Sequence, residues 1–140
     1  MRKVALFLGL ILGIASAAHA DPCKAIPDRG PMPAYLYAGA TFAGPVVYVG
    51  DGDSFCIALG RGPQNWVEVR LADFYAPELH APGGREAKAA LEQIAMGRRA
   101  TCVADHRSYD RIVAQCRIGS ASIGEQLRGA GISEGGNGFR

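Results

Sequence analysis

The chain of 140 residues lacks several features that would assign it to a common class of protein. Its 15 basic and 13 acidic residues nearly balance, whereas proteins that coat nucleic acid by charge alone are strongly basic. No cysteine or histidine pair has the CxxC or HxxxH spacing of a zinc site. The sequence contains no internal repeat and, after its first 20 residues, no second long apolar segment. Any contact with nucleic acid should therefore be local, at a site, rather than over a whole face.

The first 20 residues have the three parts of a secretory signal peptide. Arg2 and Lys3 form a basic start, residues 4–15 form an apolar run, and residues 18–20 (AHA) form a small-x-small cleavage site. The apolar run is shorter than the roughly 20 residues that a membrane-spanning helix needs, and no cysteine follows the cleavage site directly to carry a lipid. We expect cleavage near Ala20, export to the periplasm or the exterior, and a mature chain that begins at Asp21 and has no membrane span.

Four cysteines in an exported chain favour two disulfides. Of the three possible pairings we favour Cys102 with Cys116, because they lie in two expected strands joined by a short connection. Cys23 would then pair with Cys56 and attach the N-terminal segment to the rest of the fold. The first bridge would close a loop of about 15 residues and contribute about 3 kcal/mol in the chain-entropy description. Free, buried thiols are the alternative.

The mature chain has about 120 residues, which suffice for one domain but hardly for two. Residues 21–44 are rich in proline, glycine and alanine, so we expect an extended leader there. The domain is expected at residues 45–131, followed by a glycine-rich, flexible tail at residues 132–140.

Hydrophobic patterning inside this domain predicts five strands and two helices. Two runs that flank a Gly-Asp turn predict a hairpin, an alternating run predicts the third strand, and apolar residues at helical spacing before Gly97 predict a helix. The expected strands are residues 45–49, 55–59, 66–74, 101–104 and 112–118, and the expected helices are residues 83–96 and 123–127. This order predicts a mainly β fold with helices (α+β): a five-stranded OB-type barrel, with a helix between strands 3 and 4 and a short C-terminal helix.

Carboxylates and arginines near the predicted hairpin and third strand form a set suited to phosphoryl chemistry. Such chemistry needs a cation at the phosphate, a base for water, and donors for the developing charge. Asp53 could hold a metal with Asp51 in support, and Glu78, which follows a proline, could be the base. Arg70 and Arg111 offer bidentate forks that match a phosphate. Taken singly, each piece is also typical of an ordinary turn or a solvated side chain.

In combination these pieces resemble the staphylococcal nuclease (thermonuclease) family. The matching motifs are VGDGDS at 49–54, VRLADFYAPE at 69–78, GREAKAALEQIAMG at 84–97 and YDRIVAQC at 109–116. The resemblance extends from about residue 46 to residue 131. It implies a five-stranded OB barrel with helices, and calcium-dependent cleavage of DNA and RNA. We expect a monomer whose partner is nucleic acid.

The resemblance also implies roles for single residues on the metal side of such a site. Asp53 resembles the first calcium carboxylate, and Ala76 stands where the family offers a backbone carbonyl to calcium. Tyr75 replaces the aspartate that the family usually has as its second calcium carboxylate, and a neutral phenol is a poor calcium ligand. Asp73 lies two residues, or about 7 Å, away along a strand. The calcium that the family implies is therefore doubtful in this chain.

On the phosphate side, Arg70 and Arg111 resemble the family's two phosphate-binding arginines and Glu78 resembles its general base. Tyr109 matches the tyrosine that lies beside the bound nucleotide. Together these residues predict an exported, metal-assisted phosphodiesterase of nuclease type. The alternative is a weakened or inactive member that serves as an exported OB module and binds nucleic acid or protein. Retention of the base favours the enzyme, and Tyr75 favours the binding module.

Overall fold

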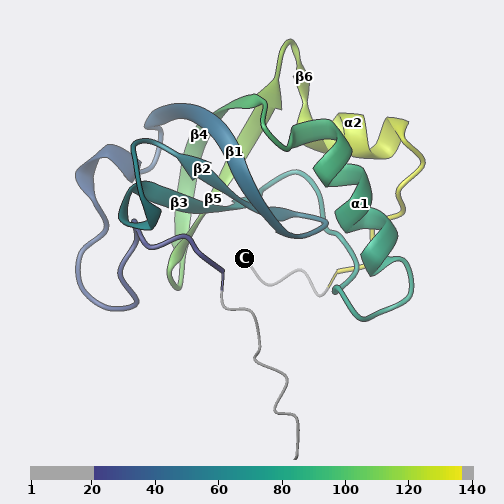
Figure 1. The fold of residues 1–140 in the computed structure, drawn as a ribbon, viewed down its shortest axis with the longest axis horizontal. Helices are drawn as coiled ribbons and strands as arrows, with labels where there is room; N and C mark the ends of the chain where they lie inside the picture. The colour runs from purple at the N-terminus through teal and green to yellow at the C-terminus, as the bar shows by residue number, and fades with distance from the viewer. Residues whose placement is uncertain (1–20, 137–140) are drawn as a thin grey trace, which may run out of the picture.

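The structure is a computed structural model that describes residues 21–136. The expected signal peptide and the last four residues of the expected tail lie outside the described residues. The described chain forms a closed barrel of five strands with one extra strand and two α-helices (Figure 1). This confirms the predicted α+β, OB-type barrel, with one helix between the third and fourth strands and a short helix near the C-terminus.

The barrel is a mixed sheet that closes between its third and fifth strands. The strands are β1 (Thr41–Asp51), β2 (Ser54–Ala58), β3 (Trp66–Leu71), β4 (Arg99–Ser108), β5 (Arg111–Ile118) and β6 (Ala121–Ser122). Their order in the sheet is β3-β2-β1-β4-β5-β6, with antiparallel neighbours throughout. A parallel pairing of β3 with β5 closes the barrel. The closure brings the outer faces of β2, β3 and β5 together as one surface.

The first strand begins earlier than the sequence predicted. β1 starts at Thr41, four residues before the expected start, because residues 41–45 pair with residues 99–103 of β4. The leader before β1 includes a short 3-10 helix (Ala34–Leu36) and places Ile26 and Leu36 in the core. β6 has only two residues, too few for hydrophobic alternation to reveal.

Two helices cover one side of the barrel and lie against each other (Figure 1). α1 (Gly84–Ala95) turns Ala87, Leu91 and Ala95 inward, as its 3.6-residue spacing predicts. α2 (Ile123–Gly129) begins with a capping box between Ser122 and Glu125, which satisfies two otherwise unpaired backbone N–H groups. Each fully buried leucine contributes about 1.5–3 kcal/mol. Helix packing therefore holds the end of the barrel that carries the β1–β2 turn.

Glycine at position 52 lets that turn approach α1 closely. A Cβ atom at Gly52 would lie 2.5 Å from the Cβ of Ala87 and 2.7 Å from the Cβ of Ala76. Neither distance is possible without a backbone shift. The β1–β2 turn is therefore held between α1 and the segment that follows β3.

The structure contains two disulfides, Cys102–Cys116 and Cys23–Cys56, and this is the pairing that the sequence favoured. Cys102 and Cys116 are direct partners in the β4–β5 pairing. Cys23 bonds to Cys56 of β2 and so attaches the leader to the outer face of the barrel. Within residues 21–136, no helix combines the length and apolarity needed to cross a membrane.

Candidate functional site

Arg70 and Arg111 lie on the same outer face of the barrel. Arg70 pairs across the parallel β3–β5 ladder with Val113, which is two residues after Arg111. Because side chains alternate along a strand, the two arginines project to the same side. Arg70 is only 8% exposed, and the Nε atoms of both arginines are buried without a hydrogen-bond partner in the described part of the chain. Buried polar groups almost always have partners, so both arginines retain donors for an anionic ligand.

Asp53 lies beside Arg70 in the β1–β2 turn, directly before β2, and is almost completely buried, with 1% exposure. Its Oδ2 atom accepts a hydrogen bond of 3.0 Å from the backbone N–H of Ala76, and its Oδ1 atom lies 3.7 Å from Nη2 of Arg70. Burial, assisted by the charge of Asp51, raises the pKa of Asp53 to about 7, although Arg70 and the Ala76 hydrogen bond oppose the shift. Asp53 therefore holds a proton at higher pH than an ordinary aspartate does.

Asp51 shapes the turn that presents Asp53. Its Oδ1 atom accepts hydrogen bonds from the backbone N–H of Asp53, at 3.1 Å, and from Oγ of Ser54, at 2.7 Å. An aspartate that bonds to the backbone two residues ahead is the usual device of an Asx turn. The carbonyl of Asp53 also accepts a 2.9 Å hydrogen bond from the N–H of Leu71 at the end of β3. The turn is thus fixed from both sides.

The segment after β3 is held by residues near the C-terminus. The N–H of Tyr75 donates to Oε1 of Glu134 at 2.8 Å, and the carbonyl of Tyr75 accepts from the N–H of Gly135 at 2.9 Å. A Cβ atom at Gly136 would lie 2.4 Å from the carbonyl oxygen of Ala76, so the chain passes directly over that oxygen. Ala76 therefore turns its N–H toward Asp53, while its carbonyl, the expected calcium ligand, faces residue 136.

Asp73 does not join Asp53. Its carboxylate lies against α2, where a Cβ atom at Gly124 would be 2.6–2.9 Å from its oxygens. Calcium takes six to eight oxygen ligands. Within residues 21–136, no group of three acidic, histidine or cysteine ligand atoms includes Asp53, and Tyr75 adds no carboxylate. The residues present do not fit a calcium site at Asp53.

Glu78 and Tyr109, the expected base and the expected nucleotide contact, are both exposed. Among the described residues Glu78 forms no ion pair, which leaves its carboxylate available to water. Tyr109 occupies the turn between β4 and β5 with a φ angle of 59° and is 82% exposed. Arg107 donates from Nε to the carbonyl of Tyr109 at 2.6 Å and supports this turn. Tyr109 thus stands next to Asp110 and Arg111 at one edge of the arginine face.

A second carboxylate cluster, formed by Asp21, Glu68 and Asp110, was not anticipated from the sequence. One oxygen from each of these residues lies within 4.8 Å of the other two. Burial raises the pKa of Glu68 to about 7, with further increases from the charges of Asp21, Asp110 and Asp51 and a partial reduction from Arg111. The cluster lies on the same outer face as the arginines, because Glu68 is two residues before Arg70 on β3.

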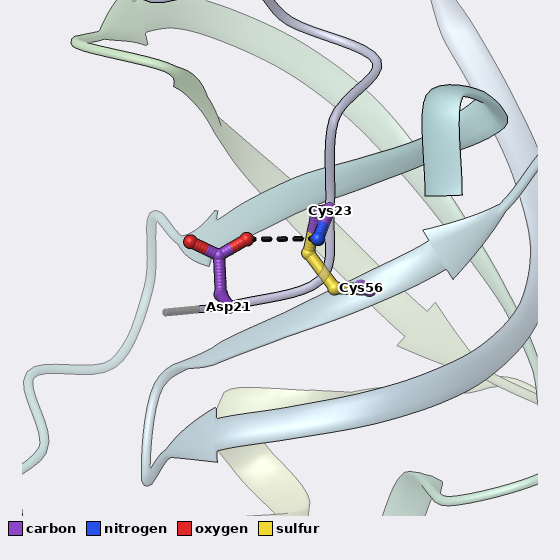
Figure 2. Close-up of a disulfide and its surroundings, with 3 residues drawn as sticks. All are labelled: Asp21, Cys23 and Cys56. Atoms are coloured by element: carbon purple, nitrogen blue, oxygen red, sulfur yellow. Dashed lines mark hydrogen bonds between the residues drawn. A yellow bond between two sulfur atoms is a disulfide. The ribbon is translucent and has the colours of Figure 1, made fainter. Parts of the chain in front are cut away.

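The position of Asp21 in this cluster depends on the first disulfide. Oδ1 of Asp21 accepts a hydrogen bond of 2.9 Å from the backbone N–H of Cys23 (Figure 2). Cys23 is bonded to Cys56, which pairs directly with Glu68 in the β2–β3 ladder. Alternation alone signals that Glu68 and Arg70 share a face, but only this long-range link brings Asp21 to the same place.

No protein-family model matches the chain, and a search of curated proteins gives no match. The fold and the site by themselves define a disulfide-bonded OB-type barrel. Its outer face carries two arginines with unused donors, a buried aspartate and a second group of three carboxylates.

Proposed function

We propose that this protein is an exported phosphodiesterase of nuclease type that hydrolyses DNA or RNA. Arg70 and Arg111 bind the phosphate, and Glu78 serves as the base. In the reaction, Glu78 takes a proton from a water molecule as the water oxygen bonds to phosphorus. The bond from phosphorus to the leaving ester oxygen then breaks, that oxygen takes a proton from solvent water, and the charge that develops on the phosphoryl oxygens is held by the two guanidinium groups.

The observation that carries this proposal is the pair of unsatisfied arginines. Two buried guanidinium Nε atoms, on adjacent parallel strands and the same face, lack partners among the described residues. An unpaired buried donor costs about 1–3 kcal/mol. A phosphate group would satisfy both donors, and arginine forks match phosphate geometry better than ammonium groups do.

Asp53 has a supporting role in this proposal. Its carboxylate, 3.7 Å from Arg70, orients that guanidinium, and its hydrogen bond to Ala76 fixes the start of the segment that leads to Glu78. No step of the proposed reaction passes through calcium, because the residues around Asp53 do not fit that ion.

The replacement of a carboxylate by Tyr75 supports a second candidate function. Without a strong metal site, the same arginine face would bind the phosphates of nucleic acid but hydrolyse them slowly or not at all. The protein would then be an exported OB module that binds nucleic acid through a local contact.

One experiment tests both candidates. The mature, oxidised protein is incubated with a single-stranded DNA oligonucleotide in excess chelator, in calcium and in magnesium, beside the variants Glu78→Gln and Glu92→Gln. Glu92 is a matched control because it lies on α1 and pairs with Lys88. We expect cleavage that Glu78→Gln abolishes and Glu92→Gln leaves unchanged. Binding without cleavage under every condition would reject the enzyme and favour the binding module, and absence of both would reject both.

A further inference from the structure

The cluster of Asp21, Glu68 and Asp110 brings three carboxyl groups together without an ion-paired cation among residues 21–136. The three residues come from the leader, the middle of β3 and the β4–β5 turn, and their oxygens lie within 4.8 Å of one another. Like charges at such distances repel by about 1–4 kcal/mol per pair in partly solvated surroundings. Arg111 lies close enough to lower the pKa of Glu68. However, no ion pair within 4.0 Å joins Arg111 to these carboxylates among the described residues.

The expected removal of the first 20 residues would supply a cation at this place. The small-x-small motif at residues 18–20 predicts cleavage directly before Asp21. Cleavage there converts the peptide N–H of Asp21 into an α-ammonium group. The backbone nitrogen of a residue is bonded to the same Cα atom as its side chain, so this new charge would arise within a few ångströms of the cluster.

The geometry around Asp21 holds that nitrogen in place. The side chain of Asp21 is bonded to the N–H of Cys23, and the Cys23–Cys56 disulfide lies beside it (Figure 2). Cys56 is the direct β-ladder partner of Glu68. Asp21, the first residue of the expected mature chain, is therefore only two residues from a disulfide to Cys56. Cys56 lies directly opposite Glu68 in the sheet.

We propose that removal of residues 1–20 supplies the missing cation: the α-ammonium group of Asp21 binds the carboxylates of Glu68 and Asp110 and fastens the new N-terminus to the barrel. The charged groups that face Glu68 are Asp21, Asp110, Arg111 and, with the smallest influence, Asp51. The pKa of Glu68 is raised to about 7 while residue 20 is still attached, and the α-ammonium would lower it. Cleavage thus turns a repulsive cluster into a paired one.

This change also affects the arginine face. Glu68 shares its face of β3 with Arg70, and its charge interacts with Arg111. Before cleavage, the three carboxylates oppose an anion at the two arginines, whereas afterwards the ammonium offsets them. The effect on ligand binding rests on the proposed function: the mature chain binds a phosphate-bearing ligand several-fold more tightly than the uncleaved chain.

The test compares two forms of the protein that differ by one residue. One begins at Asp21, and its N-terminus is verified by mass spectrometry of exported protein. The other retains Ala20, which moves the amine about 3.8 Å along the chain and leaves a peptide N–H on Asp21 without changing the total charge. Both span the whole described fold, and both are also made with Glu68→Gln.

We expect NMR titration to place the α-amine of the chain that begins at Asp21 at least about one pKa unit above the ordinary value of about 7.7. Retention of Ala20 or the Glu68→Gln change should remove most of this shift. The chain that begins at Asp21 should also unfold at a higher urea concentration at pH 7. Equal α-amine titrations in the two chains, no effect of Glu68→Gln, or an exported chain that begins elsewhere would overturn the proposal.

Binding of a short single-stranded DNA oligonucleotide is measured on the same samples as a separate readout. A shifted α-amine without DNA binding would support the N-terminal contact and reject the proposed function. DNA binding with an ordinary α-amine in both chains would support a phosphate site at the arginines and reject the N-terminal contact.

Discussion

Asp53 and Glu68 are two carboxylates near one face of the barrel, and both have a pKa raised to about 7. Burial is the largest cause in each case, but their neighbours differ. Asp53 has a cation at 3.7 Å and a backbone donor at 3.0 Å, both supplied by the segment around β3. Glu68 has two carboxylate neighbours from distant parts of the chain and no ion pair within the described residues. Asp53 thus has a cation and a backbone donor to offset its charge, whereas the nearest charged groups around Glu68 are mostly carboxylates.

The largest expected effect tests the cation beside Asp53. Arg70→Met removes the proposed phosphate donor and the partner of a buried carboxylate. We expect cleavage of an oligonucleotide to slow by about 100- to 1,000-fold, which is the usual loss for one donor to a developing charge. Steady-state kinetics give the measurement, with Arg117→Met as control because Arg117 is exposed on β5. Equal rates in the two variants would show that Arg70 does not contact the phosphate.

The pH dependence of the free energy of unfolding tests whether burial raises the pKa of Asp53. Its folded pKa, about 7, is above the ordinary aspartate value of 3.8, so the folded state holds this proton more tightly than the unfolded state. The contribution of Asp53 to stability is therefore fully present below about pH 4 and is lost as pH rises through 7, and we expect this contribution to fall by about 2 kcal/mol between pH 5 and pH 8. Urea unfolding of wild type and Asp53→Asn checks this. A fall that is the same size in the variant would contradict it.

Glu68 should show a smaller dependence that varies with the N-terminus. Its pKa is raised from 4.5 to about 7, so its contribution also falls as pH rises between these values. Because Glu68 is partly exposed, we expect about 1 kcal/mol after allowance for solvent screening. Glu68→Gln should remove this slope in a chain that retains Ala20, and should change little in one that begins at Asp21. Matching slopes in both chains would show that the α-amine does not reach Glu68.

The smallest expected effect concerns the segment that carries Tyr75. Glu134 accepts the Tyr75 N–H at 2.8 Å and lies 3.6 Å from Nε of Arg128. The side chains of Glu134 and Arg128 are both exposed to solvent. Glu134→Ala should therefore lower the free energy of unfolding by only about 0.5–1 kcal/mol. Chemical denaturation gives the value. Glu92→Ala is the control, and Glu125 is avoided because its side chain accepts from the backbone N–H of Ser122 and caps α2. A loss above about 2 kcal/mol would show that residues 131–136 are essential to the fold.

Local pattern was sufficient for most of the fold. The alternation in β3, the helical spacing of Ala87 and Leu91, and the Gly-Asp turn before β2 are short-range signals, and each appears in the structure near its expected place. The start of β1 at Thr41 and the two-residue β6 were missed. Both depend on pairing with a distant strand, which alternation within one segment does not record.

The amino-acid sequence by itself determined the order of the elements, the two arginines at strand positions and the carboxylate-bearing turns, because these depend on residues close together in the chain. Only the tertiary structure decided what those groups contact. Closure of β3 on β5 placed Arg70 and Arg111 on one face, and the Asp73 carboxylate lies against Gly124 of α2. The Cys23–Cys56 bridge then brought Asp21 to Glu68 across 47 positions of sequence. Charge interactions act through space, so the groups that surround a carboxylate become known only once the chain has folded.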